Sequence, residues 1–476
     1  MTRFVRLAAA LITIGIAIVL GILATSGPDE PQASMDGPHV IVISIDTLRR
    51  DHLVPYGYAG ATDPAPSVSA LAREGVVFER AFAANSNTAP SHASILTGLY
   101  PPSHGVLRNG YRLDKEVATL GELLAARGYR TAGFVSGFTL KDGPTGLGRG
   151  FDHYDDGDPR QRDRPAAKTF ARVQQWLAAY DFAAPLFLFV HFFDPHFPYR
   201  APPAHAEKFI PAGKDRYAFP VAADLARIRT TGPQPGEAQE YAARYAAEIH
   251  YADAQVGALL AQLRRRGVYD ECLILFVSDH GETLGERKFA FDHGGRLYDE
   301  QVRVPLVIRF PAAADAGLRV PATVHHVDIL ATIARQIGFV PPPHQGRDLQ
   351  PSIIASRQGA ATADRRPIFS MARPVPGRVP GLAEPIIRQG QVTSVRLDEL
   401  KLIAYPTAGG YTYELFDLRK DPDERNSLAA TQPQIVARLA GELQSWRTAT
   451  GGDRITPPPA LSADTEEALR ALGYIE

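Results

Sequence analysis

Runs of apolar residues alternate with segments of helical periodicity through most of the chain. The apolar runs are HVIVISI from His39, TAGFVSG from Thr131, PLFLFVHFF from Pro185, CLILFVS from Cys272 and VPLVIRF from Val304. A run that is apolar at every position predicts a strand covered on both faces, as in a parallel sheet. AKTFARVQQWLAAY and the stretch from about Glu237 to Arg266 instead space their apolar residues as helices do. The alternation predicts an α/β fold with a mostly parallel central sheet flanked by helices.

The pattern changes after about Pro341. Four shorter segments, PIFSMA, QVTSVRL, KLIAY and YTYELFDL, predict an antiparallel sheet, and an amphipathic helix follows from about Gln432 to Trp446. We therefore expect a main domain over residues 38–340 and a smaller α+β subdomain over residues 341–476.

The N-terminus has a different character. Arg3 and Arg6 precede a nearly unbroken apolar run from about Leu7 to Ala24, and a polar linker follows. A basic start before an apolar run of roughly membrane-crossing length predicts a signal anchor or a signal peptide over residues 1–25 and a linker over residues 26–37. Either interpretation places the rest of the chain on the exported side, membrane-anchored and facing the periplasm or extracellular side, or secreted if the segment is cleaved.

Charge and cysteine content limit the partners and the covalent cross-links that this protein can have. The formal net charge is -1, and no basic stripe with interleaved aromatic residues is present, so we expect no nucleic-acid partner. Cys272 is the single cysteine, which excludes an internal disulfide. Its apolar neighbours favour a core thiol.

Several carboxylates and imidazoles follow the predicted strands. Asp46 ends the first run, Asp279 and His280 end the fourth, and His196 follows the third. Ligands of an open α/β sheet bind at the carboxyl ends of its strands, so these groups are expected to converge there. Carboxylates and imidazoles from separate strands are what a divalent cation needs.

Thr88 stands at the start of a predicted helix, in the segment NTAPSHASILTG. The following Ala-Pro favours Thr88 as the N-cap of that helix. A hydroxyl there also lies where free backbone N–H groups and the helix dipole favour an anionic phosphate or sulfate group. Thr88 is therefore a candidate nucleophile as well as a cap, and the two interpretations are compatible.

Five collinear motifs resemble the sulfatase family of the alkaline phosphatase superfamily. They are VISIDTLRRDHLVPYGY, TAPSHASILTGLYPPSHGV, HFFDPHFPY, FVSDHGETLGE and DHGGRLYDEQVRVPLVIRFP, and YELFDLRKDPDERNSLA is similar to the family's C-terminal subdomain. The resemblance implies that Asp46, Asp279 and His280 ligate one divalent metal ion, Ca²⁺, Mn²⁺ or Zn²⁺. It also implies that His196 and His293 bind the non-bridging oxygens or protonate the leaving group. Arg49 is expected to reach the site or to pair with Asp51, and His104 and His191 to have supporting or structural roles.

Three departures from the family pattern bear on the substrate. Sulfatases carry Cys or Ser, oxidised to formylglycine, where this chain has Thr88, and Arg where it has His92. The usual consecutive carboxylates of the first metal strand are reduced to Asp46, followed by Thr47. The family's GKWH-like segment has no counterpart, and Lys141 is only a remote candidate.

These departures favour phosphorus chemistry. A secondary alcohol cannot be oxidised to an aldehyde, so Thr88 cannot become formylglycine. The Thr88 segment is similar to that of nucleotide pyrophosphatase/phosphodiesterases, which use an unmodified Thr, although their second metal set has no clear counterpart here. We expect an exported metal-dependent hydrolase of phosphate or sulfate esters, with Thr88 as nucleophile, His92, His196 and His293 stabilising charge, and a small-molecule, glycan or lipid ester as substrate.

Two alternatives remain open at this point. A phosphoryl head-group transferase acting on lipid or glycan would use the same Thr intermediate with an alcohol in place of water. A non-catalytic derivative of the fold would explain the missing Cys and Arg.

Overall fold

A computed structural model of the chain describes residues 37–158, 161–211, 227–228, 230–286, 290–360, 365–377, 382, 384–452 and 463–471. The expected signal anchor or signal peptide, residues 1–25, lies outside the described residues, and so does the linker except for Gly37. Within the described ranges, no helix has the length and apolar character needed to cross a membrane. The elements below all belong to one compact unit, Pro38–Glu476.

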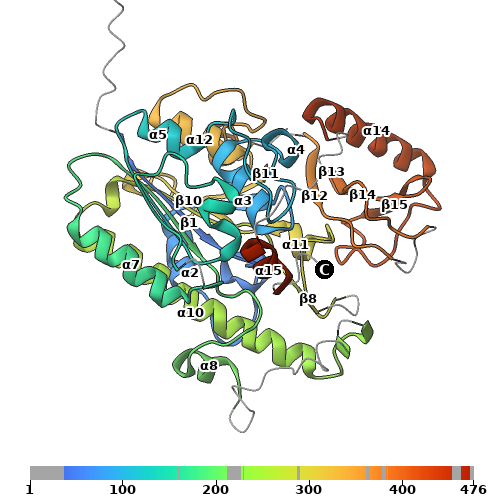
Figure 1. Cartoon of the computed structure of the whole chain (residues 1–476), viewed down its shortest axis with the longest axis horizontal. Coiled ribbons are helices and arrows are strands. Elements are labelled where there is room, and N and C mark those ends of the chain that lie inside the picture. The colour runs from blue at the N-terminus through green and yellow to red at the C-terminus, as the bar shows by residue number, and fades with distance from the viewer. Residues whose placement is uncertain are drawn as a thin grey trace, which may run out of the picture. The chain divides into compact units, whose positions relative to one another are not determined.

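A mostly parallel sheet forms the centre of this unit, with strand order β11-β2-β10-β6-β1-β5-β3-β4 (Figure 1). Its parallel half consists of β6 (Cys272–Ser278), β1 (His39–Ile45), β5 (Leu186–Phe192), β3 (Arg130–Val135) and β4 (His153–Asp155). The predicted α/β fold is thereby confirmed.

The other half of the sheet is mixed. Strand β10 (Leu306–Arg309) runs antiparallel to β6 and β2 (Val76–Phe82), β11 (Arg319–His325) runs parallel to β2, and β9 (Arg303–Val304) pairs with β2. The apolar-run criterion did not predict β2 or β11. The reason is local: Glu79 and Arg80 interrupt β2, and β11 alternates exposed and buried residues around Pro321.

Helices cover both faces of the sheet (Figure 1). One face packs against α2 (Pro66–Glu74), α7 (Ala166–Ala179) and α10 (Glu237–Arg265), and α8 (Pro203–Phe209) contacts α10. The other packs against α3 (Thr88–Thr97), α5 (Leu120–Ala125) and α12 (Asp328–Ile337). Strand β1 shows why both faces are apolar: Ile41 and Ile43 join the first cluster, whereas Val40 and Val42 join the second. Successive side chains of a strand point to opposite faces, so a doubly covered strand is apolar throughout.

The predicted antiparallel sheet is also present. Strands β12 (Ile368–Ala372), β13 (Val392–Leu397), β14 (Leu400–Thr407) and β15 (Gly410–Asp417) pair in sequence order, and α14 (Pro433–Thr450) packs on β13 and β14. The smaller elements are α4 (Pro101–His104), α6 (Asp142–Thr145), α11 (Asp299–Val302), α13 (Gln350–Arg357), α15 (Ala463–Ala471) and the hairpin β7 (Thr283–Leu284) and β8 (Ala290–Asp292).

Buried charges join this smaller sheet to the rest of the unit. Asp299 of α11 lies 2.9 Å from Arg396 of β13 and 2.8 Å from Lys401 of β14. Although burial opposes ionisation, the two cations hold the pKa of Asp299 far below its usual range. Met371 of β12 donates its N–H to the Ala84 carbonyl at 3.0 Å, which places β12 beside the segment that leads to Thr88.

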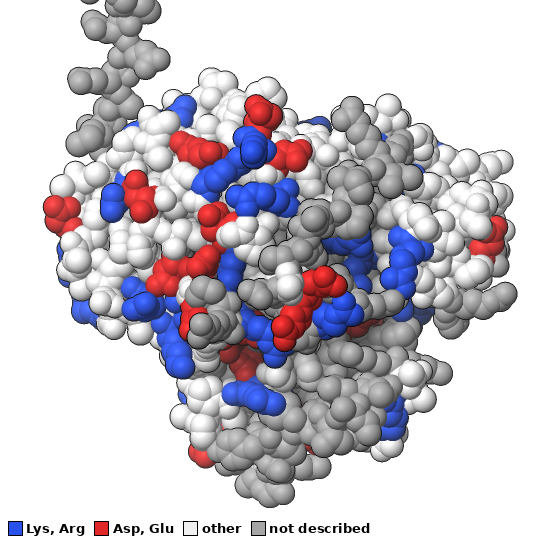
Figure 2. All heavy atoms as spheres, in the orientation of Figure 1, with Lys and Arg blue, Asp and Glu red and all other residues white. Residues whose placement is uncertain are grey.

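The strand register determines where the predicted site residues meet. Ile45, the last residue of β1, lies opposite Phe192 of β5 and Ser278 of β6. The next residues along, Asp46 and Asp279, therefore emerge side by side at the carboxyl edge of the sheet. On the surface shown in Figure 2, basic and acidic side chains are interspersed.

Candidate active site

One group of potential metal ligands lies at this edge. Asp46, Asp279 and His280 each offer a ligand atom, and these atoms all lie within 4.8 Å of one another. All three residues are fully buried. No other group of three or more His, Cys, Asp or Glu side chains meets the same criterion in the part of the chain that the structure describes.

Local hydrogen bonds fix two of these ligands. Asp279 Oδ1 accepts the backbone N–H of Thr47 at 3.1 Å and that of His280 at 2.8 Å. The His280 Nδ1 lies 2.9 Å from the Gly281 carbonyl, so Nδ1 carries the proton and Nε2 has a free lone pair. That Nε2 lies 3.8 Å from Asp46 Oδ1 and 3.4 Å from Asp279 Oδ2.

The unsatisfied oxygens of the group fit a cation. Asp46 Oδ1 and Asp279 Oδ2 are buried and have no hydrogen-bond partner. Burial, and then the charge of Asp279, holds the pKa of Asp46 well above its usual range. Two facing carboxylates in a dry site are costly unless a positive charge compensates them. Two carboxylates and one imidazole therefore fit a divalent metal ion, and the mixed donor set is compatible with Mn²⁺, Zn²⁺ or Ca²⁺.

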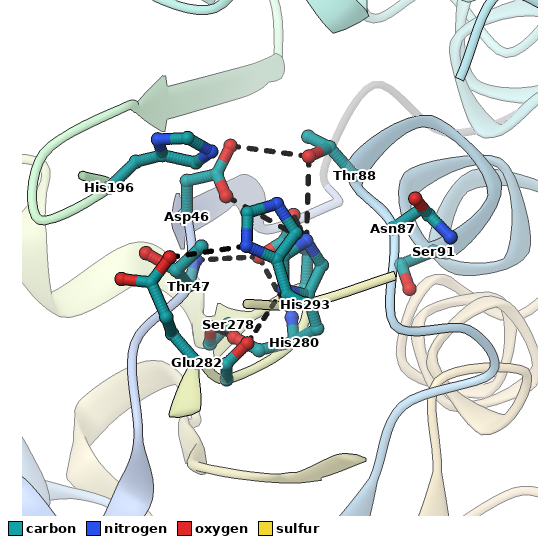
Figure 3. A network of polar contacts seen from close by, with 12 residues as sticks. Asp46, Thr47, Asn87, Thr88, Ser91, His196, Ser278, His280, Glu282 and His293 are labelled. Atoms are coloured by element: carbon teal, nitrogen blue, oxygen red, sulfur yellow. Dashed lines mark hydrogen bonds and ion pairs between the residues drawn. The ribbon is translucent and has the colours of Figure 1, made fainter. Parts of the chain in front are cut away.

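Thr88 lies directly beside this group. Its Oγ1 is 3.5 Å from Asp46 Oδ2 and 3.4 Å from His280 Nε2 (Figure 3). The prediction that Thr88 caps the helix was wrong: Asn87 occupies the cap position, Thr88 is the first helical residue, and the Asn87 side chain makes no capping hydrogen bond. The Thr88 hydroxyl instead points to the candidate metal ligands. It remains at the positive end of the α3 dipole, where an anion is favoured.

His92 contacts the main chain of Thr88. One ring nitrogen, Nδ1, lies 2.8 Å from the Thr88 carbonyl, and the other, Nε2, lies 2.8 Å from the hydroxyl of Ser44. Both polar ends of the imidazole are thus engaged by the protein, although Nδ1 is also 3.8 Å from Asp279 Oδ2. These contacts tie the first turn of α3 to strand β1.

His196 and His293 contact each other next to His280. Their rings are 4.9 Å apart edge to face, and the His293 ring stacks on His280 at 4.7 Å. Burial lowers the pKa of His196 to about 4. Burial and the neighbouring His280 hold the pKa of His293 well below its ordinary value. The structure therefore brings both predicted histidines to the metal group.

Glu282 is a site residue that the sequence reasoning did not single out. It is fully buried, its Oε1 lies 3.1 Å from His293 Nδ1, and its Oε2 accepts the Tyr199 hydroxyl. Burial raises the pKa of this carboxyl. Its position two residues after His280, in the run DHGE, was the available signal, but nothing in that run indicates that Glu282 faces His293.

Three further predicted residues lie away from the ligand atoms. Arg49 pairs with Asp51 at 2.7 Å and with Glu286 at 2.6 Å, so the ion-pair interpretation holds. His104 is buried beside the Ser94 hydroxyl at 3.0 Å. Lys141 donates its ammonium protons to the carbonyls of Asp158 and Gln161, the latter at 2.9 Å.

Thr47 occupies the place of the missing second carboxylate. Its hydroxyl is buried without a hydrogen-bond partner. Its φ of 55° lies in the left-handed region, which is strained for a β-branched residue. The Tyr245 hydroxyl, donating to the Thr47 carbonyl at 2.7 Å, and the bond to Asp279 hold this conformation.

Comparison with known proteins finds relatives that match most of this chain. A model of the sulfatase family matches residues 38–339. An ulvan-active sulfatase from Formosa agariphila is 28% identical over 90% of this chain and 88% of its own length. An N-acetylglucosamine-6-O-sulfatase from Bacteroides thetaiotaomicron is 24% identical over 86% of this chain and 85% of its own.

Solved structures extend the likeness to phosphorus-ester hydrolases. The phosphonate monoester hydrolase of Agrobacterium radiobacter superimposes with a TM-score of 0.67 at 25% identity, covering 87% of this chain and 96% of that enzyme. Given the match over most of the compact unit, this chain belongs to the sulfatase family and is a hydrolase that acts on ester bonds.

Proposed function

We propose that the chain is a metal-dependent ester hydrolase in which Thr88 is the nucleophile and phosphorus esters are preferred over sulfate esters. The observation that carries the proposal is the position of the Thr88 hydroxyl, buried at the N-terminus of α3 within 3.5 Å of both Asp46 and His280.

The chemistry of Thr favours phosphorus. Attack by Thr88 Oγ1 forms an O–P bond and breaks the bond from phosphorus to the substrate alcohol, which gives a phospho-threonine intermediate. Water then attacks phosphorus and releases Thr88 unchanged. A sulfated Thr88 lacks the second hydroxyl with which a formylglycine hydrate expels sulfate, so turnover on sulfate esters is expected to be slow.

The other residues of the site have complementary roles. Asp46 Oδ2 is the carboxylate oxygen that accepts the Thr88 proton. His196 and His293 face the same space and supply N–H donors to the leaving group or to the non-bridging oxygens. Glu282 holds His293 through Nδ1, so that a protonated ring would have an anion on both sides once an ester binds.

Asp46, Asp279 and His280 would hold the divalent metal ion. When bound, such an ion stabilises the negative charge that develops on the nucleophile and on the ester oxygens.

The alcohol portion of the substrate is proposed more broadly. Two similar proteins are named for sulfated glycans, ulvan and N-acetylglucosamine 6-O-sulfate, and one solved neighbour for phosphonate monoesters. We propose a glycan or small-molecule ester. Export through residues 1–25 also remains a proposal, which cell fractionation with an antibody against the folded unit would test.

The decisive experiment is a substrate panel on the purified full chain. Phosphomonoester, phosphodiester, phosphonate monoester and sulfate ester of 4-nitrophenol are each assayed with Mn²⁺, Zn²⁺ or Ca²⁺. We expect phosphorus esters to be favoured, Thr88→Ala to lose at least about 10³-fold in kcat, and Thr88→Ser, the matched control that keeps the hydroxyl, to retain activity. Full activity of Thr88→Ala, or a Thr88-dependent preference for the sulfate ester, would refute the proposal.

Product analysis separates hydrolysis from transfer. With glycerol present, a head-group transferase accumulates a new glycerol ester, whereas a hydrolase releases free acid. Quenched phosphodiester reactions analysed by mass spectrometry should show a peptide whose Thr88 carries the phosphoryl group together with the alcohol that was not displaced.

A further inference from the structure

His191 is a buried residue that the proposed mechanism does not use. It lies within β5, one strand away from Asp46, and is fully buried. Neither of its ring nitrogens has a hydrogen-bond partner. Nε2 nevertheless lies 3.3 Å from Asp46 Oδ2. A buried imidazole with two unsatisfied nitrogens is costly, and this one lies beside a candidate metal ligand, where a role for its N–H is to be sought.

The surroundings hold this ring in place. Its edge meets the ring of His92 at 5.0 Å and 88°. A methyl group added at Gly137 would lie 3.5 Å from His191 Cε1 and 3.1 Å from Phe193. The Ser136 hydroxyl donates to the His191 carbonyl at 2.9 Å and fixes the main chain. The ring is therefore packed from several sides with Nε2 against Asp46.

The two oxygens of Asp46 have different neighbours. Oδ1 faces His280 Nε2 and is the unsatisfied oxygen. Oδ2 is contacted by the Thr88 hydroxyl and by His191 Nε2. The Thr88 contact cannot last through turnover, because an esterified Thr88 oxygen carries no proton to donate. Of the two side chains placed beside Oδ2, His191 is the one that keeps an N–H throughout.

We propose that His191 is a positioning residue, which donates its Nε2–H to Asp46 Oδ2 and so holds Oδ1 towards the metal ion during the whole reaction. The inference rests on the metal site of the proposed function. A carboxylate that ligates a metal is commonly held by a hydrogen bond to its other oxygen, and loss of such a partner typically weakens metal binding about 10–100-fold.

Metal affinity tests this role without relying on activity. Mn²⁺ binding to the purified full chain is measured by isothermal titration calorimetry for the wild type, His191→Phe and His191→Gln. Phe fills the space without a donor, whereas Gln places an amide N–H near the position of Nε2. We expect His191→Phe to bind Mn²⁺ about 10–100-fold more weakly and His191→Gln to stay within about threefold of wild type.

His104→Asn is the matched control. It also replaces a buried histidine, but one that contacts Ser94 and lies away from the candidate ligands, so Mn²⁺ affinity should not change. Thermal melts in EDTA check that each variant folds before its affinity is compared.

Three outcomes would overturn the proposal. If His191→Phe binds Mn²⁺ as wild type does, the ring only fills space. If Phe and Gln weaken binding equally, packing and not donation is responsible. If the wild type binds none of Mn²⁺, Zn²⁺ or Ca²⁺, the metal site itself is absent. By contrast, an active Thr88→Ala together with a weakened His191→Phe would refute the proposed nucleophile and leave the role of His191 standing.

Discussion

Replacing Asp279 by Asn separates two properties of the candidate metal site: its affinity for a metal ion and its effect on the stability of the metal-free protein. Asn keeps Oδ1, which accepts the N–H groups of Thr47 and His280 at 3.1 and 2.8 Å. It exchanges the unpartnered Oδ2 for an amide that can donate to the equally unpartnered Asp46 Oδ1. The metal-free variant should therefore be more stable than the metal-free wild type.

The size of the effect follows from the distance between the ligand atoms. At 4.8 Å, the largest separation of the ligand atoms, two carboxylate charges repel each other by about 3.5 kcal/mol at an effective dielectric constant of about 20. Burial and the charge of Asp279 raise the pKa of Asp46, and any protonation of Asp46 lowers this repulsion and with it the expected gain in stability. For a unit of this length the unfolding entropy is about 0.9 kcal/mol/K, so the melting temperature in EDTA should rise by up to roughly 3–4 °C.

Adding the metal ion should stabilise the wild type more than Asp279→Asn. At a Mn²⁺ concentration of 100 times Kd, metal binding raises the free energy of unfolding of the wild type by about 2.7 kcal/mol. Asp279→Asn should gain little, because it has lost one anionic ligand. Differential scanning fluorimetry with EDTA or Mn²⁺ measures both effects. Asp253→Asn is the control, since that buried carboxylate accepts two backbone N–H groups at 2.9 Å, so its loss should lower stability and leave the Mn²⁺ shift unchanged. A lower melting temperature of Asp279→Asn in EDTA, or an undiminished Mn²⁺ shift, would refute the reasoning.

Three further substitutions test other parts of the structure. Burial lowers the pKa of His104 to about 3 from an unfolded value of 6.5, so the free energy of unfolding falls as the pH falls, by about 2 kcal/mol at pH 5. Denaturant titrations at pH 7.5 and pH 5 should therefore show a loss of stability that is smaller by that amount in His104→Asn than in the wild type. An equal loss in both proteins would contradict the shift. Thr47→Asp adds a carboxylate beside Asp46 and replaces a strained β-branched residue by one that tolerates positive φ. The Mn²⁺ affinity measured by calorimetry should therefore rise about tenfold. Weaker binding would show that the Thr47 hydroxyl does not face the ion. Glu282→Gln removes the charge that would support a protonated His293, so kcat for alkyl phosphodiesters should fall about 10–100-fold. The kcat for 4-nitrophenyl esters should change less than about threefold, because 4-nitrophenol leaves with little protonation. Equal losses on both substrates would argue against leaving-group protonation.

The fold was largely predictable from the sequence where burial is complete. Strands β1, β5 and β6 are apolar at nearly every position because helices cover both faces of the sheet, and that pattern is visible in the residues themselves. Strands β2 and β11 were not predicted, since exposed positions interrupt their apolar residues and pairing with partners distant in the chain stabilises them.

The apolar runs were enough to show which residues stand at the carboxyl ends of the buried strands, and the strand register brings the ligand atoms of Asp46, Asp279 and His280 within 4.8 Å of one another. The sequence also identified Thr88, because its segment resembles the nucleophile segment of sulfatases and Thr departs from the Cys or Ser used there. The directions of the side chains, by contrast, depend on how the whole chain folds. The tertiary structure turned the Thr88 hydroxyl from a helix cap to the candidate metal ligands, directed both nitrogens of His92 to protein partners, and set Glu282 and His191 against groups on other elements. These contacts join residues far apart in the chain, and periodicity records only whether a position is buried, not which neighbour it meets.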